Sequence, residues 1–328
     1  MAIPSGLASF LGAKRESVYG TYVAPDLYFE FDSESLTRQP TFLTSTGLRS
    51  GRMAAPISRH KQTTSTAGGG LTMKVPTKGF GRFLDLLHGN TVTPAQQAAT
   101  IAYLQTHNIG LTAPTGKSLS MQIGKPDVAG TIQPFSYVGS KITQAGFSCD
   151  LGGELMANLT IDSRDEDTAQ TLATPSYASG ISSLDFVGGN VTIDGSQLAI
   201  ISSANLQIPL PLKADRYGIG NGALKAEPIP NDYIRPTGSL TMEFNGLTAY
   251  NYFVNNTTAS VVLDFQGAII ASTYKEQLKF TMAACHFTGT TPQVGGPDIL
   301  TMELPFEVYD NGSVAPIVAL YQSVDTTL

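Results

Sequence analysis

Residues 68–89 read GGGLTMKVPTKGFGRFLDLLHG, and residues 237–256 read TGSLTMEFNGLTAYNYFVNN, a weaker copy of the same pattern. In both stretches a turn containing Gly and Thr follows an apolar strand and leads into apolar residues at helical spacing. The shared Leu-Thr-Met lies at 71–73 and again at 240–242, about half the chain apart. One short strand-turn-helix unit is therefore present twice.

Other segments of the two halves resemble one another in the same order along the chain. The pairs are FEFDSESL (29–36) with VTIDGSQL (191–198), SLSMQIG (118–124) with SVVLDFQG (260–267), KITQAGFSCDLG (141–152) with QLKFTMAACHFTG (277–289), and ELMANLTID (154–162) with ILTMELPFEVYD (299–310). Ordered repetition of this kind predicts an internal duplication. The predicted divisions are an N-terminal arm over 1–27, a first β-domain over 28–170 with a long loop at 45–70, a linker over 171–189, and a second β-domain over 190–328 with a long loop at 207–236.

Composition and alternation predict a mainly β fold. The chain contains 33 Gly and 19 Pro, and little of it has helical periodicity, which favours strands joined by turns. We expect two similar β-domains of the sandwich or barrel-forming kind, each with one short helix. Strands with one apolar face expose the other to solvent or to a solvent-filled space. The polar positions of two such strands are Glu30, Asp32, Glu34, Asn158 and Asp162.

The charge of the chain excludes some partners and indicates others. Charged residues make up only 14% of the chain, against roughly 25% in ordinary soluble domains, so much of the surface is expected to be covered by neighbours. The net charge of −6 excludes a nucleic-acid binder that neutralises phosphates. Basic residues outnumber acidic ones in residues 1–90, and the reverse holds in residues 171–328.

Targeting signals and disulfides are not expected. Cys149 and Cys285 lie in predicted strands at matching places in the two halves. The alternatives are a disulfide and two buried core thiols, and the absence of a secretory signal favours the thiols. The N-terminus has its charges after its short apolar run, which is the wrong order for a secretory signal. No apolar stretch reaches transmembrane length. The sequence therefore predicts a protein made in the cytosol, with no membrane insertion.

Motifs of catalysis and metal binding are weak. His60, His88, His107 and His286 are interpreted as lying in unrelated settings, with His88 at a helix end. Residues 115–118 read TGKS but run into a strand, whereas a phosphate-binding loop needs a helix there. We therefore expect no catalytic residue, no metal and no cofactor, and the chain is not predicted to be an enzyme.

Residues 10–36, FLGAKRESVYGTYVAPDLYFEFDSESL, resemble the opening of the tail tube (major tail) proteins of long-tailed, siphovirus-type bacteriophages. The positions that match the family pattern are Gly12, Lys14, Glu16, Ser17, Tyr19, Gly20, Thr21, Ser33 and Ser35. The resemblance continues through residues 68–89 and 139–162. It implies rings whose strands close into one β-barrel, stacked into a hollow tube for DNA delivery. A duplicated chain is then expected to form a trimeric, pseudo-hexameric ring.

The resemblance also implies partners and a location. The expected partners are further copies of the chain, the tape-measure protein in the lumen, the tail terminator and distal tail or baseplate proteins at the tube ends, and double-stranded DNA that passes without specific binding. The protein is expected in the virion tail, after assembly in the host bacterial cytoplasm. The lumen is expected to be lined by acidic or polar residues, with the polar strand positions named above as candidates, because phosphate should not adhere to it.

Contacts between rings or subunits are expected at two basic segments. The first is the N-terminal segment with Lys14, Arg15, Glu16 and Tyr19. The second is the 45–70 loop with Arg49, Arg52, Arg59 and Lys61, which has too little apolar content to fold on itself. The alternative from another class is a β-sandwich virion module for capsid decoration or receptor binding. Hollow tubes or rings in the electron microscope favour the first interpretation, and compact monomers favour the alternative.

Overall fold

The computed structural model describes residues 5–289 and 291–328, and the fold is mainly β, as predicted. The strands of the first half are β1 (Phe10–Arg15), β2 (Leu27–Phe29), β3 (Ser33–Glu34), β4 (Thr37–Thr44), β5 (His60–Lys74), β6 (Ala95–Gln96), β7 (Tyr103–Ile109), β8 (Leu119–Pro126), β9 (Ile132–Cys149), β10 (Met156–Ser163) and β11 (Asp165–Asp167). Those of the second half are β12 (Gly189–Ile193), β13 (Ser196–Gln197), β14 (Ile201–Pro209), β15 (Leu212–Lys213), β16 (Ile229–Pro230), β17 (Thr237–Glu243), β18 (Thr258–Ala271), β19 (Tyr274–Phe287), β20 (Thr301–Val308) and β21 (Ile317–Ser323). The helices are α1 (Gly81–Leu84) and α2 (Thr248–Val254), with short 3-10 turns η1 (Gly6–Ala8), η2 (Ile57–Arg59) and η3 (Asp85–Leu87).

The two halves contribute strands to the main sheet in the same order. In the first half β4 pairs with β5, β5 with β10, and β10 with β9. In the second half β14 pairs with β17, β17 with β20, and β20 with β19. The register also corresponds, because Leu71 faces Leu159 in one half and Leu240 faces Leu304 in the other. The two Leu-Thr-Met strands therefore occupy equivalent places in the sheet.

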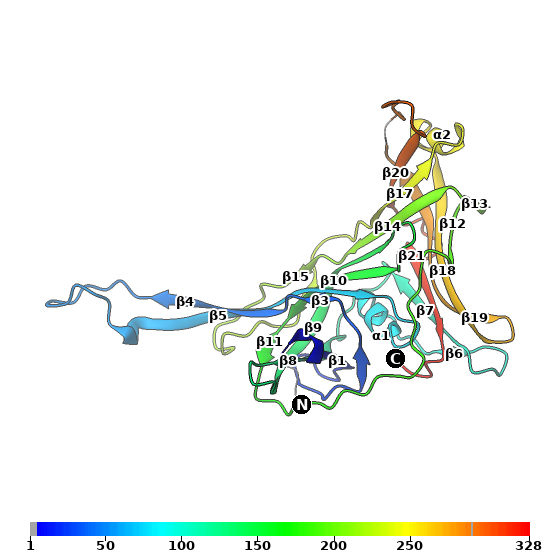
Figure 1. Ribbon diagram of the computed structural model, residues 1–328. Helices are drawn as coiled ribbons and strands as arrows, with labels where there is room; N and C mark the ends of the chain where they lie inside the picture. The colour runs from blue at the N-terminus through cyan, green and yellow to red at the C-terminus, as the bar shows by residue number, and fades with distance from the viewer. Residues whose placement is uncertain (1–4, 290) are drawn as a thin grey trace.

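Strand β9 joins the halves by pairing with β14, with Phe147 opposite Leu206. The result is one continuous antiparallel sheet that passes from the first half into the second (Figure 1). Helix α1 follows β5 and helix α2 follows β17, as the repeated pattern predicts. In Figure 1, α2 lies at the far end of the second-half strands.

Glycines allow the close approach of strands beside both Leu-Thr-Met segments. Gly69 has a φ of +155°, and a β-carbon there would collide with the carbonyl group of Ser35. At the equivalent position Gly238 lies against the Phe306 ring and the Asn205 carbonyl, which again leaves no room for a β-carbon. The glycines at the start of both repeated stretches are thus explained by strand packing.

A second layer of strands covers the apolar face of the main sheet. Strands β1, β2, β8 and β11 form a smaller sheet with the first part of β9, and β18, β21 and β7 extend β19 in the second half. A single apolar core runs between the layers and across the junction of the halves. In it the rings of Phe147 and Phe280, one from each half, lie 4.7 Å apart. Cys149 and Cys285 are both buried and free, as predicted.

Three segments expected to be irregular are more ordered than the sequence indicates. The first long loop is confined to residues 45–59, because residues 60–70 belong to β5 and pair with β4 or β10. The second contains the short β15–β16 pair. The linker is fixed to the first half by hydrogen bonds of Ser182 and Leu184 with β5 and β10 neighbours, since its backbone groups find partners there.

Candidate assembly surfaces

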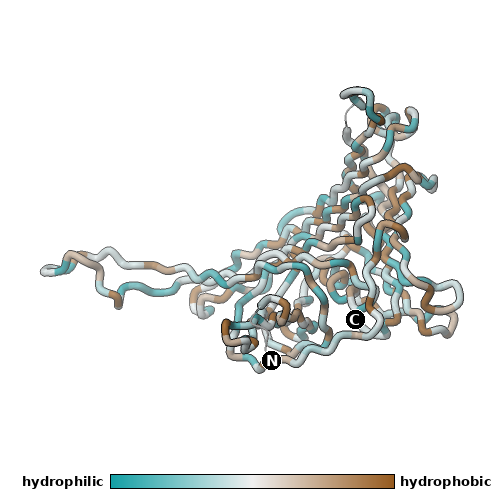
Figure 2. Tube along the Cα trace, viewed as in Figure 1, coloured by the Kyte–Doolittle hydropathy of each residue, from teal (hydrophilic) through white to brown (hydrophobic). Residues whose placement is uncertain are grey.

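The main sheet has one polar face that its own chain leaves uncovered over most of its length. A row of paired residues crosses it from β5 to β20: Thr72, Asn158, Gly146, Gln207, Thr237 and Glu307. The next row is apolar and buried: Met73, Ala157, Phe147, Leu206 and Phe306. The alternation of hydrophilic and hydrophobic residues along these strands is visible in Figure 2.

Exposed acidic residues of this polar face lie on second-half strands. Glu243 is on β17, and Glu303 and Glu307 are on β20. None of the three forms a salt bridge with another described residue. In the first half Lys74 is offset by Glu154, with their charged atoms 2.8 Å apart. We did not predict these three glutamates, although the alternation of TGSLTME and TMELPFEV contains the same signal as ELMANLTID.

The residues predicted to line the lumen are divided among several places. Asn158 lies on the polar face and accepts a hydrogen bond from the Thr72 hydroxyl at 3.0 Å. Asp162 lies on it too, but its carboxylate pairs with the buried Lys225 ammonium. Glu34 points to the other side of the sheet, where it pairs with Lys125 at 2.9 Å. It does so because it is opposite the inward-facing Leu71.

Glu30 and Asp32 lie in the short irregular segment that connects β2 to β3, near Lys74. Both carboxylates, together with Glu154, raise the pKa of the Lys74 ammonium above its usual value, and the hydrogen bond from Glu154 is the largest cause. They therefore lie beside the first-half end of the polar face, in a patch of mixed charge.

The predicted N-terminal contact residues belong to the chain's own fold. Residues 10–15 are part of the body, because β1 pairs with both β2 and β8. Lys14 pairs with Asp26 at 3.3 Å and Arg15 with Asp85 at 2.9 Å. Both cations therefore form ion pairs with carboxylates of the same chain.

Glu16 is a buried structural carboxylate. It accepts hydrogen bonds from the hydroxyls of Ser118 and Ser120 at 2.6 and 2.8 Å, and from the backbone amides of Gly20 and Gly139 at 2.7 and 2.8 Å. Nearby, the Tyr19 ring lies under the Arg164 guanidinium, and burial raises the pKa of its phenol above the usual range. The motif that carries the family resemblance therefore fixes the N-terminal segment to the body.

The other predicted contact segment projects away from the body, as Figure 1 shows for β4 and β5. We call residues 37–66 the first arm. It carries Arg38, Arg49, Arg52, Arg59 and Lys61, and the sequence contains no acidic residue from 36 to 84. Every residue of β4 is exposed, and two strands alone are marginally stable in water. The first arm is therefore an exposed surface that packs little against its own chain.

The long segment of the second half, residues 210–236, behaves differently and is called the second arm. It folds back over the first half, where Lys225 reaches Asp162 on β10 and the Tyr217 hydroxyl donates to the Ser65 carbonyl on β5 at 2.6 Å. Glu227 pairs with the buried Lys141 ammonium on β9 at 2.6 Å. Each contact joins the second arm to a main-sheet strand of the other half.

A groove of about 770 Å³ opens beside the base of the second arm. It is lined by apolar residues and prolines, with acids at Asp232, Glu307 and Asp310 and one cation at Arg235. The Tyr309 hydroxyl donates a hydrogen bond to the Glu307 carboxylate at 2.5 Å. The groove is thus apolar within and acidic overall.

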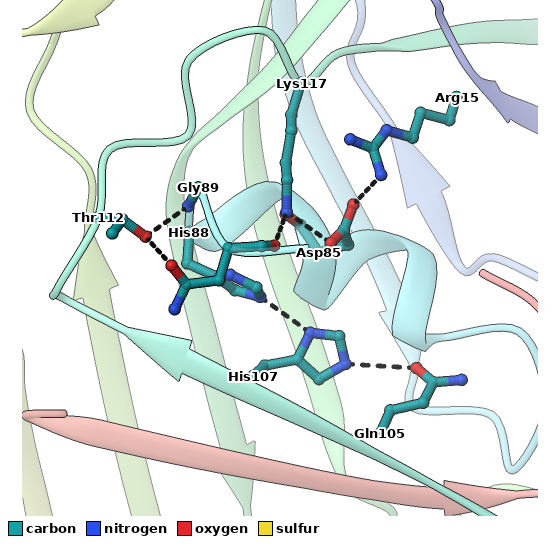
Figure 3. Close-up of polar contacts among 9 residues, drawn as sticks. Arg15, Asp85, His88, Gly89, Gln105, His107, Thr112 and Lys117 are labelled. Carbon is teal, nitrogen blue, oxygen red and sulfur yellow. Dashed lines mark hydrogen bonds and ion pairs between the residues drawn. The ribbon is translucent and has the colours of Figure 1, made fainter. Parts of the chain in front are cut away.

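A buried polar cluster lies at the end of the α1–η3 helical segment (Figure 3). His88 and His107 were interpreted as unrelated, but the structure places their Nε2 and Nδ1 atoms 3.0 Å apart because β7 passes beside the end of η3. Asp85 accepts from Lys117 at 2.6 Å and from Arg15 at 2.9 Å. Asp85 and the two histidines have the side-chain types and proximity of metal ligands. Both carboxylate oxygens already accept from cations, however, so the donor set fits an ion-pair network better than a metal centre.

Burial keeps this histidine pair neutral. Desolvation, and then the charge of Lys117, lower the pKa of His88 to about 4. Desolvation, the His88 ring and Lys117 lower the pKa of His107 to about 3. The His107 Nε2–H faces the Gln105 side-chain oxygen at 3.3 Å, so Nδ1 is the acceptor and His88 the donor. The cluster acts as a structural link between α1–η3 and β7.

A continuous sheet with a free polar face and a projecting two-stranded arm is typical of a structural protein that assembles with further chains. The sequence model of the family described as phage tail tube protein matches residues 6–308. The chain therefore belongs to the phage tail tube protein family, whose members have a structural role in the virion tail. No curated protein matches the chain. No helix among the described residues is long and apolar enough to cross a membrane.

Proposed function

We propose that three copies of the chain close into a ring with pseudo-sixfold symmetry, and that stacked rings form the tail tube. The observation that carries the proposal is the β9–β14 junction, which joins two strand groups of the same order and register. The first strand group is β4-β5-β10-β9, and the second is β14-β17-β20-β19. If the same kind of junction forms between chains, six equivalent groups make a closed barrel. Internal duplication is the simplest origin of the two groups.

The ends of the main sheet support closure. Strand β4, the counterpart of β14, pairs only with β5 among the described strands. An edge strand with unpaired backbone groups is a template for another strand. In the ring, β4 of one chain meets the end of its neighbour's sheet that β18, β19 and β20 form.

The polar face of the main sheet is assigned to the lumen. Its apolar face is already covered by the chain's second layer, which leaves the polar face for the inside of the barrel. Glu243 and Glu303, with uncharged neighbours such as Thr241 and Ser239, give this surface acidic character. Such a wall repels phosphate, so DNA passes without specific binding.

The proposal extends to the partners implied by the tube. The lumen holds the extended tape-measure protein before DNA passes, and the tail terminator and the distal tail or baseplate proteins bind the two ends of the tube. Assembly takes place in the host cytoplasm. No step requires catalysis, so the protein is proposed to be purely structural.

Electron microscopy of the purified protein is the first test. Rings or open-ended hollow tubes are the expected result, because β4 has an unpaired edge and the tip of the first arm is exposed in the described part of the single chain. A monodisperse compact monomer at high protein concentration, with no rings or tubes, would contradict the proposal.

A further inference from the structure

The two arms are equivalent parts of the two halves. In the first arm Phe42 and Leu43 of β4 pair with Gln62 and Lys61 of β5. In the second arm Leu212 and Lys213 of β15 pair with Pro230 and Ile229 of β16, at corresponding distances from the two Leu-Thr-Met strands. The tips, residues 45–59 and 214–228, have the same length. One arm therefore lies on a neighbouring strand group while the other extends into solvent.

The place where the second arm lies has a counterpart in the second half. Asp162, which Lys225 contacts, is opposite Gly68 in the sheet. Glu307 is opposite Thr237, the residue that corresponds to Gly68. Glu307 thus occupies in the second half the position that Asp162 has in the first. By the same correspondence, Ser65, which bonds to the second arm, matches Ile234.

Glu307 and Ile234 both line the 770 Å³ groove. The groove is therefore the second-half counterpart of the surface that the second arm covers in the first half. Asp162 has a lysine partner there, whereas Glu307 has no cationic partner among the described residues. The groove differs from the first-half surface in that no arm of the described chain covers it.

The first arm has the chemistry that the groove requires. Its tip is basic, with Arg49, Arg52 and Arg59, and no acid accompanies them. It also exposes large apolar side chains, including a fully exposed Met53, which suit a groove lined by leucines and prolines. Opposite charge and shared apolar surface favour docking of one on the other.

We propose that the first-arm tip of a neighbouring copy occupies this groove, with an arginine of the tip paired with Glu307. The inference rests on the proposed ring, because it uses the contact that each strand group makes with the next. Within a chain the second arm holds the first half, and between chains the first arm holds the second half. The groove of one subunit and the first arm of the next then form a contact between subunits of a ring, which we call the clasp.

Engineered cysteines test this placement. Ala54 corresponds to Ala223, whose carbonyl accepts from the Ser65 amide, so Ala54→Cys and Ile234→Cys are paired in one chain. The native thiols are buried and do not compete. Oxidation of assembled tubes is expected to give disulfide-linked dimers and trimers on a non-reducing gel. The matched control replaces Ile234→Cys by Thr241→Cys, which lies on the polar face outside the groove.

Linkage only within single chains, no linkage in tubes, or equal linkage with Thr241→Cys would overturn the clasp while leaving the tube intact. Failure of the unmodified protein to form rings or tubes would instead defeat the proposed function.

A charge-reversal experiment tests the placement independently of the engineered cysteines. Glu307→Arg is expected to raise the protein concentration needed for tube growth at least about 10-fold, as for loss of an interfacial charge pair. Glu303→Arg, on the same strand outside the groove, should change it less than about 2-fold, and equal effects of the two would refute the pairing.

Discussion

Acidification is predicted to destabilise the fold through His88 and His107. Burial and the charge of Lys117 hold the pKa of His88 at about 4, and burial with the His88 ring holds that of His107 at about 3. An unfolded histidine titrates near 6.5. The unfolded chain therefore binds protons more tightly, and the stability that the neutral pair contributes above pH 6.5 is lost as the pH falls toward 4.

The size of the effect follows from these values. Between pH 8 and pH 5, preferential protonation of the unfolded chain costs about 2 kcal/mol for each histidine. The two contributions add, because both rings stay largely neutral in the folded protein at pH 5. The expected loss for the pair is therefore about 4 kcal/mol. Lys117 and Arg15 add to the penalty of a second positive charge here, and Asp85 offsets part of it.

Urea unfolding followed by circular dichroism measures this loss, since the chain has no Trp for fluorescence. The comparison is with the double variant His88→Gln and His107→Asn, whose amides replace the donor Nε2 and the acceptor Nδ1 without titrating. The wild-type free energy of unfolding should fall more steeply than that of the variant between pH 8 and pH 5. Parallel pH profiles for the two proteins would refute the reasoning.

Three further predictions concern stability, assembly and transport. Glu16→Gln places an amide donor against hydroxyl and backbone donors, so thermal unfolding should show a loss of roughly 2 to 3 kcal/mol; a change below 0.5 kcal/mol (about the size expected for surface substitutions) would contradict this. Replacing residues 46–58 by a short turn should leave soluble protein but few long tubes in electron micrographs, and normal tube growth would count against a role of the first arm. Glu243→Lys with Glu303→Lys should leave tubes intact but slow DNA ejection from phage, because cations in the lumen bind phosphate; unchanged ejection would remove the electrostatic role of the lumen.

The sequence was sufficient for the strand pattern and for the repeated unit. Strict alternation in 154–162 and the two Leu-Thr-Met segments predicted strands that the structure places in equivalent positions. Internal duplication itself, and the division into domains, stay predictions. The 45–70 segment was predicted to be a loop because its strands are polar on both faces, and alternation gives no signal in a two-stranded arm that is exposed on both sides.

The surfaces were predicted less well, because they depend on long-range contacts. The contact between subunits predicted for the Lys14 to Tyr19 motif stays a prediction, but the sequence did not indicate that three of the four hydrogen bonds to Glu16 come from residues more than a hundred positions away. His88 and His107 meet only because β7 crosses behind η3. Glu34 was assigned to the polar face by simple alternation, but the chain is irregular between β2 and β3 and turns it to the opposite side. Local periodicity contains none of this information.

The number of chains in a ring is the most direct test of the account. A cryo-electron microscopy reconstruction of assembled tubes, processed without imposed rotational symmetry, would measure it. We predict three chains per ring, six similar strand groups around one continuous barrel, and β4 of each chain beside the end of the next chain's sheet that β18, β19 and β20 form. Six chains per ring, or a barrel in which only one half of each chain lines the lumen, would contradict the account.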